Sequence, residues 1–335
     1  MSLPGFLLVY CLSGGLVSGC LTPVRSADLD PHWNEYKSNF QKAYNRLVES
    51  ARRSKWEENF ERIRRHNEEA AGGKHNYTLK VNHLADMSRG EYLVRMTTLR
   101  HSRRRRLSGD DVVGAQALAA TGKLPEEVDW RAKGFVTPSW NQRDCGACYA
   151  FSVVSSVEGQ LWKKTGGLVR MSEQQVVDCS IETGNMGCDG GSLRNTLKYL
   201  EQKGLMTSLD YPYLAKQGLC RYSKHKVAVN ITKWAILPAR DEETMKAAVA
   251  TLGPIPVSIN ASPRTFQFYH KGVYDDPKCP DDAVNHAMLL VGYTKHAWIL
   301  KNWWTDTWGD HGYMYIRRGK NRCGISNYAA YVVIV

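Results

Sequence analysis

Two cysteines separated by two residues are the first candidates for chemistry in this sequence. Cys145 and Cys148 lie in the segment NQRDCGACYAFS, and an apolar run follows at once. Such a pair could be redox-active, supply half of a metal site, or combine one structural cysteine with one reactive cysteine. Apolar residues recur at helical spacing over residues 153–161, and two glycines at 166 and 167 give a stop signal. The pattern therefore places Cys148 at a helix N-terminus, where the macrodipole and unpaired backbone N–H groups favour the nucleophilic thiolate.

A histidine and an asparagine farther along the chain could complete a nucleophilic site. His286 interrupts the apolar segment VNHAMLLVGY, and the next strand-like run, AWILKNWW, ends in the residues that include Asn302. An imidazole beside a thiol favours the thiolate, and an amide can hold the imidazole in one orientation. A single histidine in an apolar strand is more often a core residue than a catalytic one. The spacing from Cys148 is therefore the observation that separates the two interpretations. His286 lies about 140 residues and Asn302 about 150 residues after Cys148, which is typical of catalytic Cys–His–Asn sets.

Length and charge exclude one class of function. The chain of 335 residues exceeds one average domain, so we expect a core domain with an accessory segment. The formal net charge is +12, but the Lys and Arg residues are scattered. The one dense run, Arg103–Arg106, has no interleaved aromatic residues. We therefore predict no nucleic-acid partner.

The first residues have the pattern of a secretory signal. A short apolar stretch, Phe6–Leu12, is followed by the small residues 17–19, although no Lys or Arg precedes it. A membrane-spanning helix would need about 20 apolar residues without these glycines. We therefore predict a signal peptide over residues 1–19 and no membrane span there or later in the chain.

Export makes the cysteine count informative. Two of the nine cysteines, Cys11 and Cys20, lie in or beside the predicted signal, so seven remain. In an oxidising compartment six of them can form disulfides while one thiol stays free. The count alone does not identify the free cysteine.

The chain divides into an accessory segment and a core domain near Leu124. Between residues 49 and 67 a set of side chains recurs at steps of three and four, which predicts one face of a helix. Residues 101–123 are polar, basic and small without a sustained period, as in a linker. In the core domain a helical first half precedes strand-like runs such as PIPVSI, HAMLLVGY, AWILKNWW and YMYIRR. This succession predicts an α+β fold of two subdomains.

Several motifs follow one another in the order known from one enzyme family. NQRDCGACYAFS, SEQQVVDCS, GCDGG, VNHAMLLVGY and KNWWTDTWGDHGY occur in the core domain, and VNHLADM follows the upstream helix. The upstream motif positions are Glu49, Arg53, Trp56, Asn59, Ile63, Asn67, Asn82, Leu84 and Asp86. On these motifs the chain resembles the papain-like cysteine peptidases, specifically the cathepsin L, K and S group, over nearly everything after the signal.

The resemblance implies a fold and a function. The fold would be the papain-like α+β fold, with a helical left subdomain, a β-barrel-like right subdomain and an active-site cleft between them. Residues 20–124 would form a helical inhibitory propeptide with a basic linker, and residues 125–335 the mature peptidase domain. The implied function is a cysteine endopeptidase made as a zymogen, which hydrolyses peptide bonds through an acyl-enzyme. No metal or other cofactor is implied.

Partners and location are implied in the same way. Protein and peptide substrates, the chain's own propeptide and cystatin-type inhibitors would bind it, and the enzyme would be a monomer. It would enter the secretory pathway and act in lysosomes or outside cells. Asn76 and Asn230 begin acceptor sequons for N-glycans, which fits that route, whereas Asn260 is a poorer acceptor because its sequon is followed by Pro263.

The family's catalytic residues carry over position by position. Cys148 would be the nucleophile, His286 its general acid/base, and Asn302 the residue that orients the ring. The side chain of Gln142 and the backbone N–H of Cys148 would form the oxyanion hole. Trp304 would shield the His–Asn hydrogen bond from water.

The resemblance also assigns the disulfides and so answers which cysteine is free. The implied pairs are Cys145–Cys188, Cys179–Cys220 and Cys279–Cys323, which leave Cys148 unpaired. No thioredoxin-like βαβ pattern surrounds the two neighbouring cysteines, which argues against a redox pair. No second C-x-x-C or H-x-x-H accompanies them, which argues against zinc.

A substrate-binding surface follows from the same positions. Gly190 and Gly191 have no side chain to obstruct a substrate backbone. The substrate residue two places before the cleaved bond (P2) would enter an apolar pocket. The walls of that pocket, given by position, are Leu193, Ser258, Val284 and Ala287, with Tyr328 at its far end. A tyrosine there would shorten the pocket and favour Leu or Val over Phe.

Four residues near the predicted site depart from the family pattern: Arg143, Tyr149, Trp303 and Thr305. Arg143 and Thr305 replace glycines, so a positive φ at either position would cost about 1 kcal/mol or more. The short connection YTKHAW between the His and Asn strands is a further difference. No departure removes a reacting group. Together, however, the departures leave a second hypothesis, a non-catalytic papain-like binding protein. A protease inhibitor built on the propeptide is a third hypothesis, which leaves the core domain unexplained.

Overall fold

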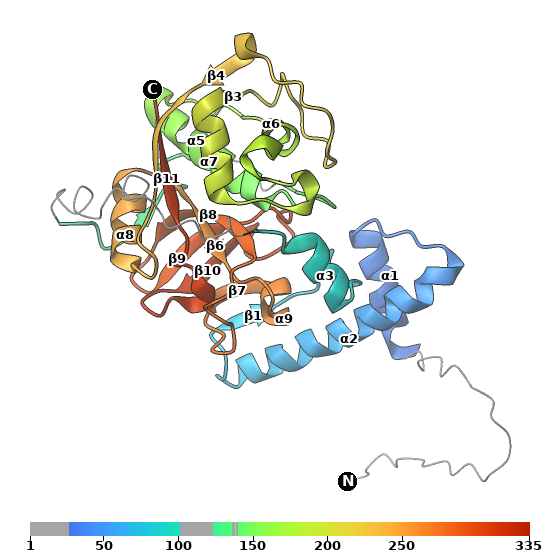
Figure 1. Ribbon diagram of the computed structural model, residues 1–335. Helices are drawn as coiled ribbons and strands as arrows, with labels where there is room; N and C mark the ends of the chain where they lie inside the picture. The colour runs from blue at the N-terminus through green and yellow to red at the C-terminus, as the bar shows by residue number, and fades with distance from the viewer. Residues whose placement is uncertain (1–26, 101–122, 136–137, 139) are drawn as a thin grey trace, which may run out of the picture.

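The computed structural model describes residues 27–100, 123–135, 138 and 140–335 (Figure 1). The predicted signal peptide, residues 1–19, and the basic run Arg103–Arg106 lie outside these ranges. Within them, no helix is long and apolar enough to cross a membrane. The same residues contain no group of three His, Cys, Asp or Glu side chains that could hold a metal ion.

The accessory segment folds into helices and one short strand. Its elements are the 3-10 turn η1 (Ala27–Leu29), α1 (Asp30–Asn39), α2 (Arg46–Ala71), β1 (Tyr77–Leu79) and α3 (Arg89–Met96). The side chain of Asn45 caps α2 by accepting two backbone N–H groups of its first turn, and Gly72 follows its last residue. Ser88 and Glu91 form a capping box at the start of α3. The helix predicted over residues 49–67 is confirmed inside α2.

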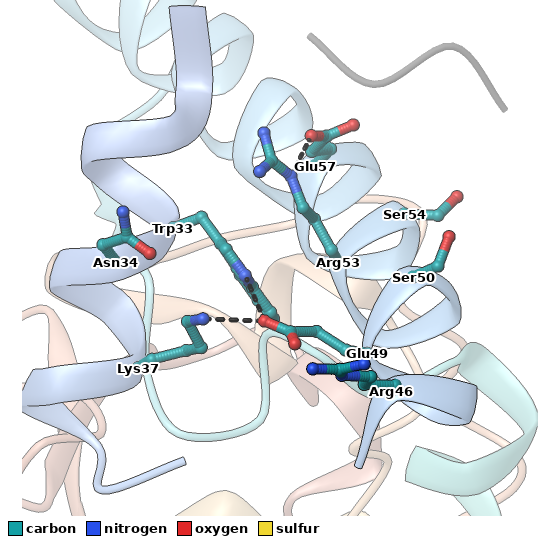
Figure 2. Close-up of a pocket in the computed structure, with 9 residues that line it drawn as sticks. All are labelled: Trp33, Asn34, Lys37, Arg46, Glu49, Ser50, Arg53, Ser54 and Glu57. Atoms are coloured by element: carbon teal, nitrogen blue, oxygen red, sulfur yellow. Dashed lines mark hydrogen bonds and ion pairs between the residues drawn. The ribbon is translucent and has the colours of Figure 1, made fainter. Parts of the chain in front are cut away.

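Helices α1 and α2 pack through a face that is both aromatic and charged. The Trp33 indole of α1 is buried, and its Nε1 donates to Glu49 Oε1 over 3.3 Å. Lys37 Nζ contacts the same carboxylate oxygen at 2.7 Å. The buried Arg53 guanidinium pairs with Asp30 on α1. Figure 2 shows Glu49 and Arg53 lining a small pocket with side chains of α1. The two motif positions therefore hold α1 against α2.

The core domain combines helices with a sheet (Figure 1). Its α-helices are α5 (Cys148–Thr165), α6 (Glu173–Cys179), α7 (Leu193–Lys203), α8 (Glu242–Thr251) and α9 (Arg264–Gln267). Its strands are β2 (Val128–Asp129), β3 (Leu205–Met206), β4 (Val227–Val229), β5 (Ile231–Ile236), β6 (Ile255–Ile259), β7 (Tyr269–Tyr274), β8 (His286–Tyr293), β9 (Ala297–Lys301), β10 (Tyr313–Arg317) and β11 (Ala330–Ile334). The 3-10 turns are η3 (Ser180–Thr183), η4 (Gly187–Asp189), η5 (Lys224–Lys226) and η6 (Arg322–Gly324).

One sheet joins the accessory segment to the core domain. Its strand order is β1-β7-β10-β9-β8-β2, and β6 also pairs with β8. Strand β1 lies antiparallel to β7 with Tyr77 opposite Gly272, so the accessory segment extends the edge of the sheet. Helix α5 packs against β6, β8 and β11, which sets the helix beginning at Cys148 against the strand beginning at His286. The four predicted strand runs contain β6, β8, β9 and β10, although the run AWILKNWW extends three residues past the end of β9 at Lys301. Helix α8 in this half was not predicted.

Disulfides cross-link the core domain at three places. The pairs are Cys145–Cys188, Cys179–Cys220 and Cys279–Cys323. Cys148 is the free cysteine among the described residues. These are the pairs that the family resemblance implies. Cys145 is therefore a structural residue that ties the turn before α5 to the loop carrying Cys188.

Candidate active site

Cys148 is the first residue of α5, as the sequence pattern predicts. Its backbone N–H lies in the first turn, where the helix offers no carbonyl to accept it. The side chain is fully buried, and this burial raises the pKa of the thiol to about 11, although the backbone N–H of Ala287 acts in the opposite direction. The thiol is therefore neutral in this closed state.

His286 and Asn302 face each other from neighbouring strands. His286 begins β8, and Asn302 directly follows β9. Imidazole Nε2 and Asn302 Oδ1 are 2.8 Å apart, and Nδ1 has no hydrogen-bond partner among the described residues. Burial lowers the pKa of His286 to about 4, and the Asn302 contact opposes this only in part. The indole of Trp304 covers the pair, with ring centroids 4.8 Å apart.

A segment after α3, residues 97–100, lies over these groups, and we call it the covering segment. Thr98 Oγ1 is 3.9 Å from Cys148 Sγ. The backbone N–H of Leu99 donates to the carbonyl of Asn285 over 2.9 Å. Asn285 directly precedes His286. The segment thus closes the site, which explains why both ionisable groups are buried.

Two glycines contact the covering segment, one by leaving room for it and one by a backbone hydrogen bond. Gly190 has a φ of 110°, and a Cβ added there would lie 2.0 Å from the carbonyl oxygen of Thr98. The carbonyl of Gly191 accepts the backbone N–H of Arg100 over 2.8 Å. Leu99 and Gly191 form a parallel bridge. An extended backbone therefore already occupies the groove in which the sequence places a substrate.

Helix α3 anchors the covering segment at the site. Tyr92 of α3 meets the Trp304 indole edge-on, with centroids 5.8 Å apart. Its hydroxyl donates to the carbonyl of Ala261 over 2.6 Å, and the whole side chain is buried. Neither Tyr92 nor the covering segment was predicted from the sequence. In the sequence Tyr92 is only one apolar residue of a short segment. That pattern does not predict that its ring contacts Trp304.

Gln142 lies beside the N-terminus of α5. Its side-chain Nε2 donates to the carbonyl of Cys145 over 3.1 Å, and its backbone N–H donates to the carbonyl of Trp303 over 2.9 Å. The hydroxyl of Tyr213 donates to the Gln142 carbonyl over 2.8 Å. The Gln142 side chain is fully buried. The Gln142 amide is therefore held against the turn that leads into Cys148.

Known proteins share this arrangement. Residues 124–333 match the family described as papain family cysteine protease, and residues 33–92 match the cathepsin propeptide inhibitor domain. The chain belongs to the papain family. Cathepsin K of Mus musculus is 43% identical over 324 residues, which cover 94% of this chain and 96% of that protein. Cathepsin L2 of Homo sapiens is 37% identical over 341 residues, which cover 99% of both chains.

A solved proenzyme has the same architecture. The structure of digestive procathepsin L 3 of Tenebrio molitor larval midgut superposes with a TM-score of 0.83 at 31% identity, covering 92% of this chain and 100% of that chain. These matches confirm the resemblance drawn from the sequence motifs. The protein is a cysteine-type peptidase of papain-like fold with an inhibitory propeptide, and the match to the peptidase domain decides against an inhibitor built on the propeptide alone.

Two of the four departures from the papain-family pattern have positive φ. Arg143 has a φ of 53° and Thr305 a φ of 64°. Such conformations cost an L-residue about 1–3 kcal/mol each. The backbone N–H of Arg143 donates to Asn141 Oδ1 over 2.8 Å, and Thr305 Oγ1 lies 2.6 Å from Thr307 Oγ1. These local bonds offset part of the strain, so the chain keeps the backbone that a glycine would adopt.

The other two departures bury aromatic side chains. The Tyr149 hydroxyl donates to the carbonyl of Gly187 over 2.9 Å, which ties α5 to the GCDGG loop. The Trp303 indole is fully buried and stacks on Phe151. Neither displaces Cys148 or the residues around it.

Most of the predicted P2-pocket residues lie together. Ser258 of β6 pairs with Ala287 of β8, and the Ser258 backbone N–H donates to the carbonyl of Tyr328 over 2.8 Å. Val284 lies just ahead of β8 and is buried. Leu193 begins helix α7 beside the two glycines, on the helical subdomain. The pocket would therefore have one wall from each subdomain.

A cluster of buried charges behind the site was not predicted. Lys301, which precedes Asn302, is 1% exposed, and burial lowers its pKa to about 7. Burial also raises the pKa of Glu173 to about 7. Arg170 contacts Glu173 at 2.9 Å and Glu158 of α5 at 3.7 Å. The lysine in the apolar run AWILK was the one sequence signal for this cluster.

Proposed function

We propose that this peptidase is a zymogen whose mature domain cleaves internal peptide bonds with Cys148 as nucleophile and His286 as general acid/base. The covering segment carries the proposal, because it closes a site that already contains the complete set of reacting groups. Asn302 holds the imidazole through Nε2, which leaves Nδ1 available to the thiol. Residues 20–124 are the inhibitory propeptide with its basic linker, and residues 125–335 are the mature domain.

Departure of the covering segment would change the charge state of the site. Burial is what raises the pKa of the Cys148 thiol and lowers that of the His286 imidazole. Exposure to water therefore favours transfer of the thiol proton to the imidazole, and the helix N-terminus stabilises the thiolate. The active form is then a thiolate–imidazolium pair.

The pair can carry out both halves of peptide hydrolysis. The thiolate attacks the scissile carbonyl carbon, a C–S bond forms and the carbonyl electrons move onto oxygen. When the tetrahedral species collapses, the C–N bond breaks and the imidazolium gives its proton to the leaving amine. A water molecule then attacks the acyl carbon while His286 accepts its proton. The second tetrahedral species collapses with cleavage of the C–S bond, which releases the carboxylic acid product and restores the thiolate–imidazolium pair. Gln142 Nε2 and the Cys148 N–H stabilise the oxyanion, at about 3–4 kcal/mol per donor.

The substrate backbone would replace the covering segment along Gly190 and Gly191. Its P2 side chain would enter the pocket formed by Ser258, Ala287 and Tyr328 together with Val284 and Leu193. An apolar residue is preferred, and Tyr328 favours Leu or Val over Phe by about 1–3 kcal/mol, the usual worth of a methylene in such pockets.

The proposal extends to where the enzyme acts. The signal peptide over residues 1–19 directs the chain to the secretory pathway, with lysosomes or the outside of cells as its destination. Asn76 and Asn230 are exposed and can carry N-glycans, whereas Asn260 is buried. Cystatin-type inhibitors would compete with substrates for the cleft of a monomeric enzyme.

A thiol-directed probe tests the proposed function. The full-length protein is incubated with an epoxide or vinyl-sulfone peptide at neutral pH and after acid treatment. We expect one label, on the peptide that contains Cys148, only after acid treatment, together with cleavage of a fluorogenic peptide that has Leu at P2. Acid-treated protein that neither labels nor cleaves the peptide would show that the groove binds without turnover.

A further inference from the structure

Trp303 occupies a position where the papain family usually has serine, and its indole is 0% exposed at the centre of the site. Its backbone already links two functional residues. The Trp303 N–H donates to Asn302 Oδ1 over 2.8 Å, and its carbonyl accepts the backbone N–H of Gln142 over 2.9 Å. Any residue could make these two backbone bonds, so they do not explain an indole.

The side chain makes two further contacts that a serine cannot make. Indole Nε1 donates to the carbonyl of Ala287 over 3.0 Å. The indole face stacks on Phe151 of α5, with centroids 5.4 Å apart and planes 29° apart. A serine hydroxyl is too short to span from one partner to the other. The indole therefore bridges strand β8 and helix α5.

Both partners of the indole are close in sequence to a reacting residue. Ala287 directly follows His286, and its backbone N–H interacts with the Cys148 sulfur. Phe151 lies three positions after Cys148 in the same helix, and so on the turn that carries the nucleophile. The indole thus ties the strand that carries the imidazole to the helix that carries the thiol, at the level of the reacting atoms.

We propose that Trp303 is a positioning residue for peptide hydrolysis, whose indole sets the separation of His286 and Cys148 across the boundary between the sheet and α5. The inference rests on the proposed function of those two residues. A displacement of about 1 Å between reacting groups can cost up to about 100-fold in rate, so a bridge at this place acts on the chemical step. A buried indole N–H also needs an acceptor, and Ala287 supplies it.

Trp303→Phe tests the bridge because it keeps an aromatic ring against Phe151 and removes the N–H. Trp130→Phe is the matched control. The buried Trp130 indole donates to the backbone carbonyl of Val249 over 2.7 Å, so the same bond type is lost away from the site. Each full-length proenzyme is acid-activated, and three quantities are measured: kcat and KM for a fluorogenic peptide, the melting temperature, and the pH dependence of Cys148 alkylation by iodoacetamide.

For Trp303→Phe we expect kcat to fall about 5- to 50-fold with KM changed less than about threefold, because the interaction acts on reacting groups and not on uniform binding. The alkylation profile should also shift in pH. Trp130→Phe should lower the melting temperature by a similar amount and leave kcat and the alkylation profile unchanged. Trp303→Ser, which removes both side-chain contacts, should lose more activity than Trp303→Phe.

A Trp303→Phe enzyme with the wild-type kcat and alkylation profile would overturn the inference, as would equal effects from Trp130→Phe. If Trp303→Phe does not accumulate as folded proenzyme, Phe151→Leu removes the stack from the helix side while keeping the indole, and the same readouts decide. A wild-type protein that neither labels nor cleaves would instead count against the proposed function, so the two failures are distinguishable.

Discussion

Three disulfides cross-link the peptidase domain, whereas the described propeptide, residues 27–100, has no cysteine and is held by ion pairs, hydrogen bonds and aromatic contacts. The sequence separations within the disulfides are 43, 41 and 44 residues. Covalent links of this kind do not respond to a change in pH, but ionisable contacts do. The peptidase domain thus has cross-links that a fall in pH leaves intact, whereas the described propeptide is held by non-covalent contacts.

Two clusters within the propeptide, one around Asp86 and one around His66, respond to acid differently. Burial alone would raise the pKa of Asp86, but attraction to Lys42 and hydrogen bonds from Tyr36 and Tyr44 leave it below its ordinary value. Its contribution to docking is therefore present above the ordinary range of an aspartate and is lost only as pH falls through the lowered pKa. Protonation of the carboxylate at this motif position therefore takes place below the ordinary pKa of an aspartate. His66 is the better candidate for the group whose protonation releases the propeptide in mild acid.

The largest effect should come from the peptidase domain acting on its own propeptide. Cys148→Ser keeps the size of the side chain and removes the thiolate, so we expect at least about a 10⁴-fold loss in kcat and a proenzyme that stays intact in acid. Gel analysis of the acid-treated protein and peptide hydrolysis measure this. A trace of wild-type mature enzyme is the control, because it should process the variant. If the purified Cys148→Ser variant processes itself, Cys148 is not the nucleophile.

The stabilisation of the peptidase domain by its disulfides can be tested at a bond that lies away from the active site. Replacing both Cys179 and Cys220 by alanine opens a loop of 41 residues, for which chain entropy predicts a loss of about 4 kcal/mol in the unfolding free energy. Urea unfolding of the mature domain, blocked at Cys148 by the thiol probe, measures it. The pH at which the propeptide releases should not move. A parallel shift in release would show that the two regions are not stabilised independently.

Sequence pattern predicted the elements that carry the reacting groups better than those that cover them. The helix beginning at Cys148 and the strand beginning at His286 follow from apolar periodicity and a glycine stop, which are local signals. The covering segment, with Thr98 over the thiol, has no chemical signature, because its place depends on where α3 docks. Helix α8 was missed in a half read as strand-rich. The double tryptophan KNWW suggests core packing, and only the structure shows that Trp303 bridges β8 and α5.

The directions of the pKa shifts were also out of reach of the sequence. Position relative to a helix predicts a thiolate at Cys148, yet the closed structure raises the pKa of that thiol because burial outweighs the favourable N–H groups. The ionisation state belongs to the covered or uncovered site, and covering is a tertiary property. The same holds for Lys301, whose lowered pKa results from burial among the helices.

A moderate effect is expected at the acidic cluster of the propeptide. Asp86 accepts from the Tyr36 hydroxyl over 2.7 Å and the Tyr44 hydroxyl over 2.8 Å, and pairs with Lys42 at 2.9 Å. Asp86→Asn removes the charge from this buried set and should destabilise the propeptide by about 1–3 kcal/mol. Thermal melting in the Cys148→Ser background measures it, and the active protein should process itself at a higher pH.

The control for this charge removal is Glu68→Gln on the same propeptide. Glu68 contacts Arg64 at 2.6 Å, and both side chains are largely exposed. Solvent screens such a pair, so no measurable change in melting or processing is expected. If the two substitutions behave alike, buried charge at Asp86 does not hold the propeptide in place.

The smallest and most specific effect should come from His66. This histidine of α2 is buried, its Nε2 lies 3.1 Å from the carbonyl of Tyr77, and its ring stacks on His75 with centroids 4.2 Å apart. Burial lowers its pKa from the ordinary value of 6.5; the Tyr77 carbonyl, Glu69 and Asp276 act in the opposite direction and His75 in the same one. A released propeptide therefore binds a proton more readily than a docked one. Docking stability is complete above the ordinary imidazole pKa and falls as pH drops through it toward the lowered value.

His66→Gln keeps a neutral amide that can donate to Tyr77 and removes the titration. In the Cys148→Ser background, the melting temperature of the propeptide should fall less steeply between neutral and mildly acidic pH than with His66 present. In the active protein, self-processing should move to a more acidic pH. His32→Gln on α1 is the matched control, because that ring is exposed and packs only on Phe60 at 5.2 Å among the aromatic side chains described. An unchanged pH profile for His66→Gln, or an equal shift for His32→Gln, would assign acid release to the carboxylates and remove the distinction between the two clusters.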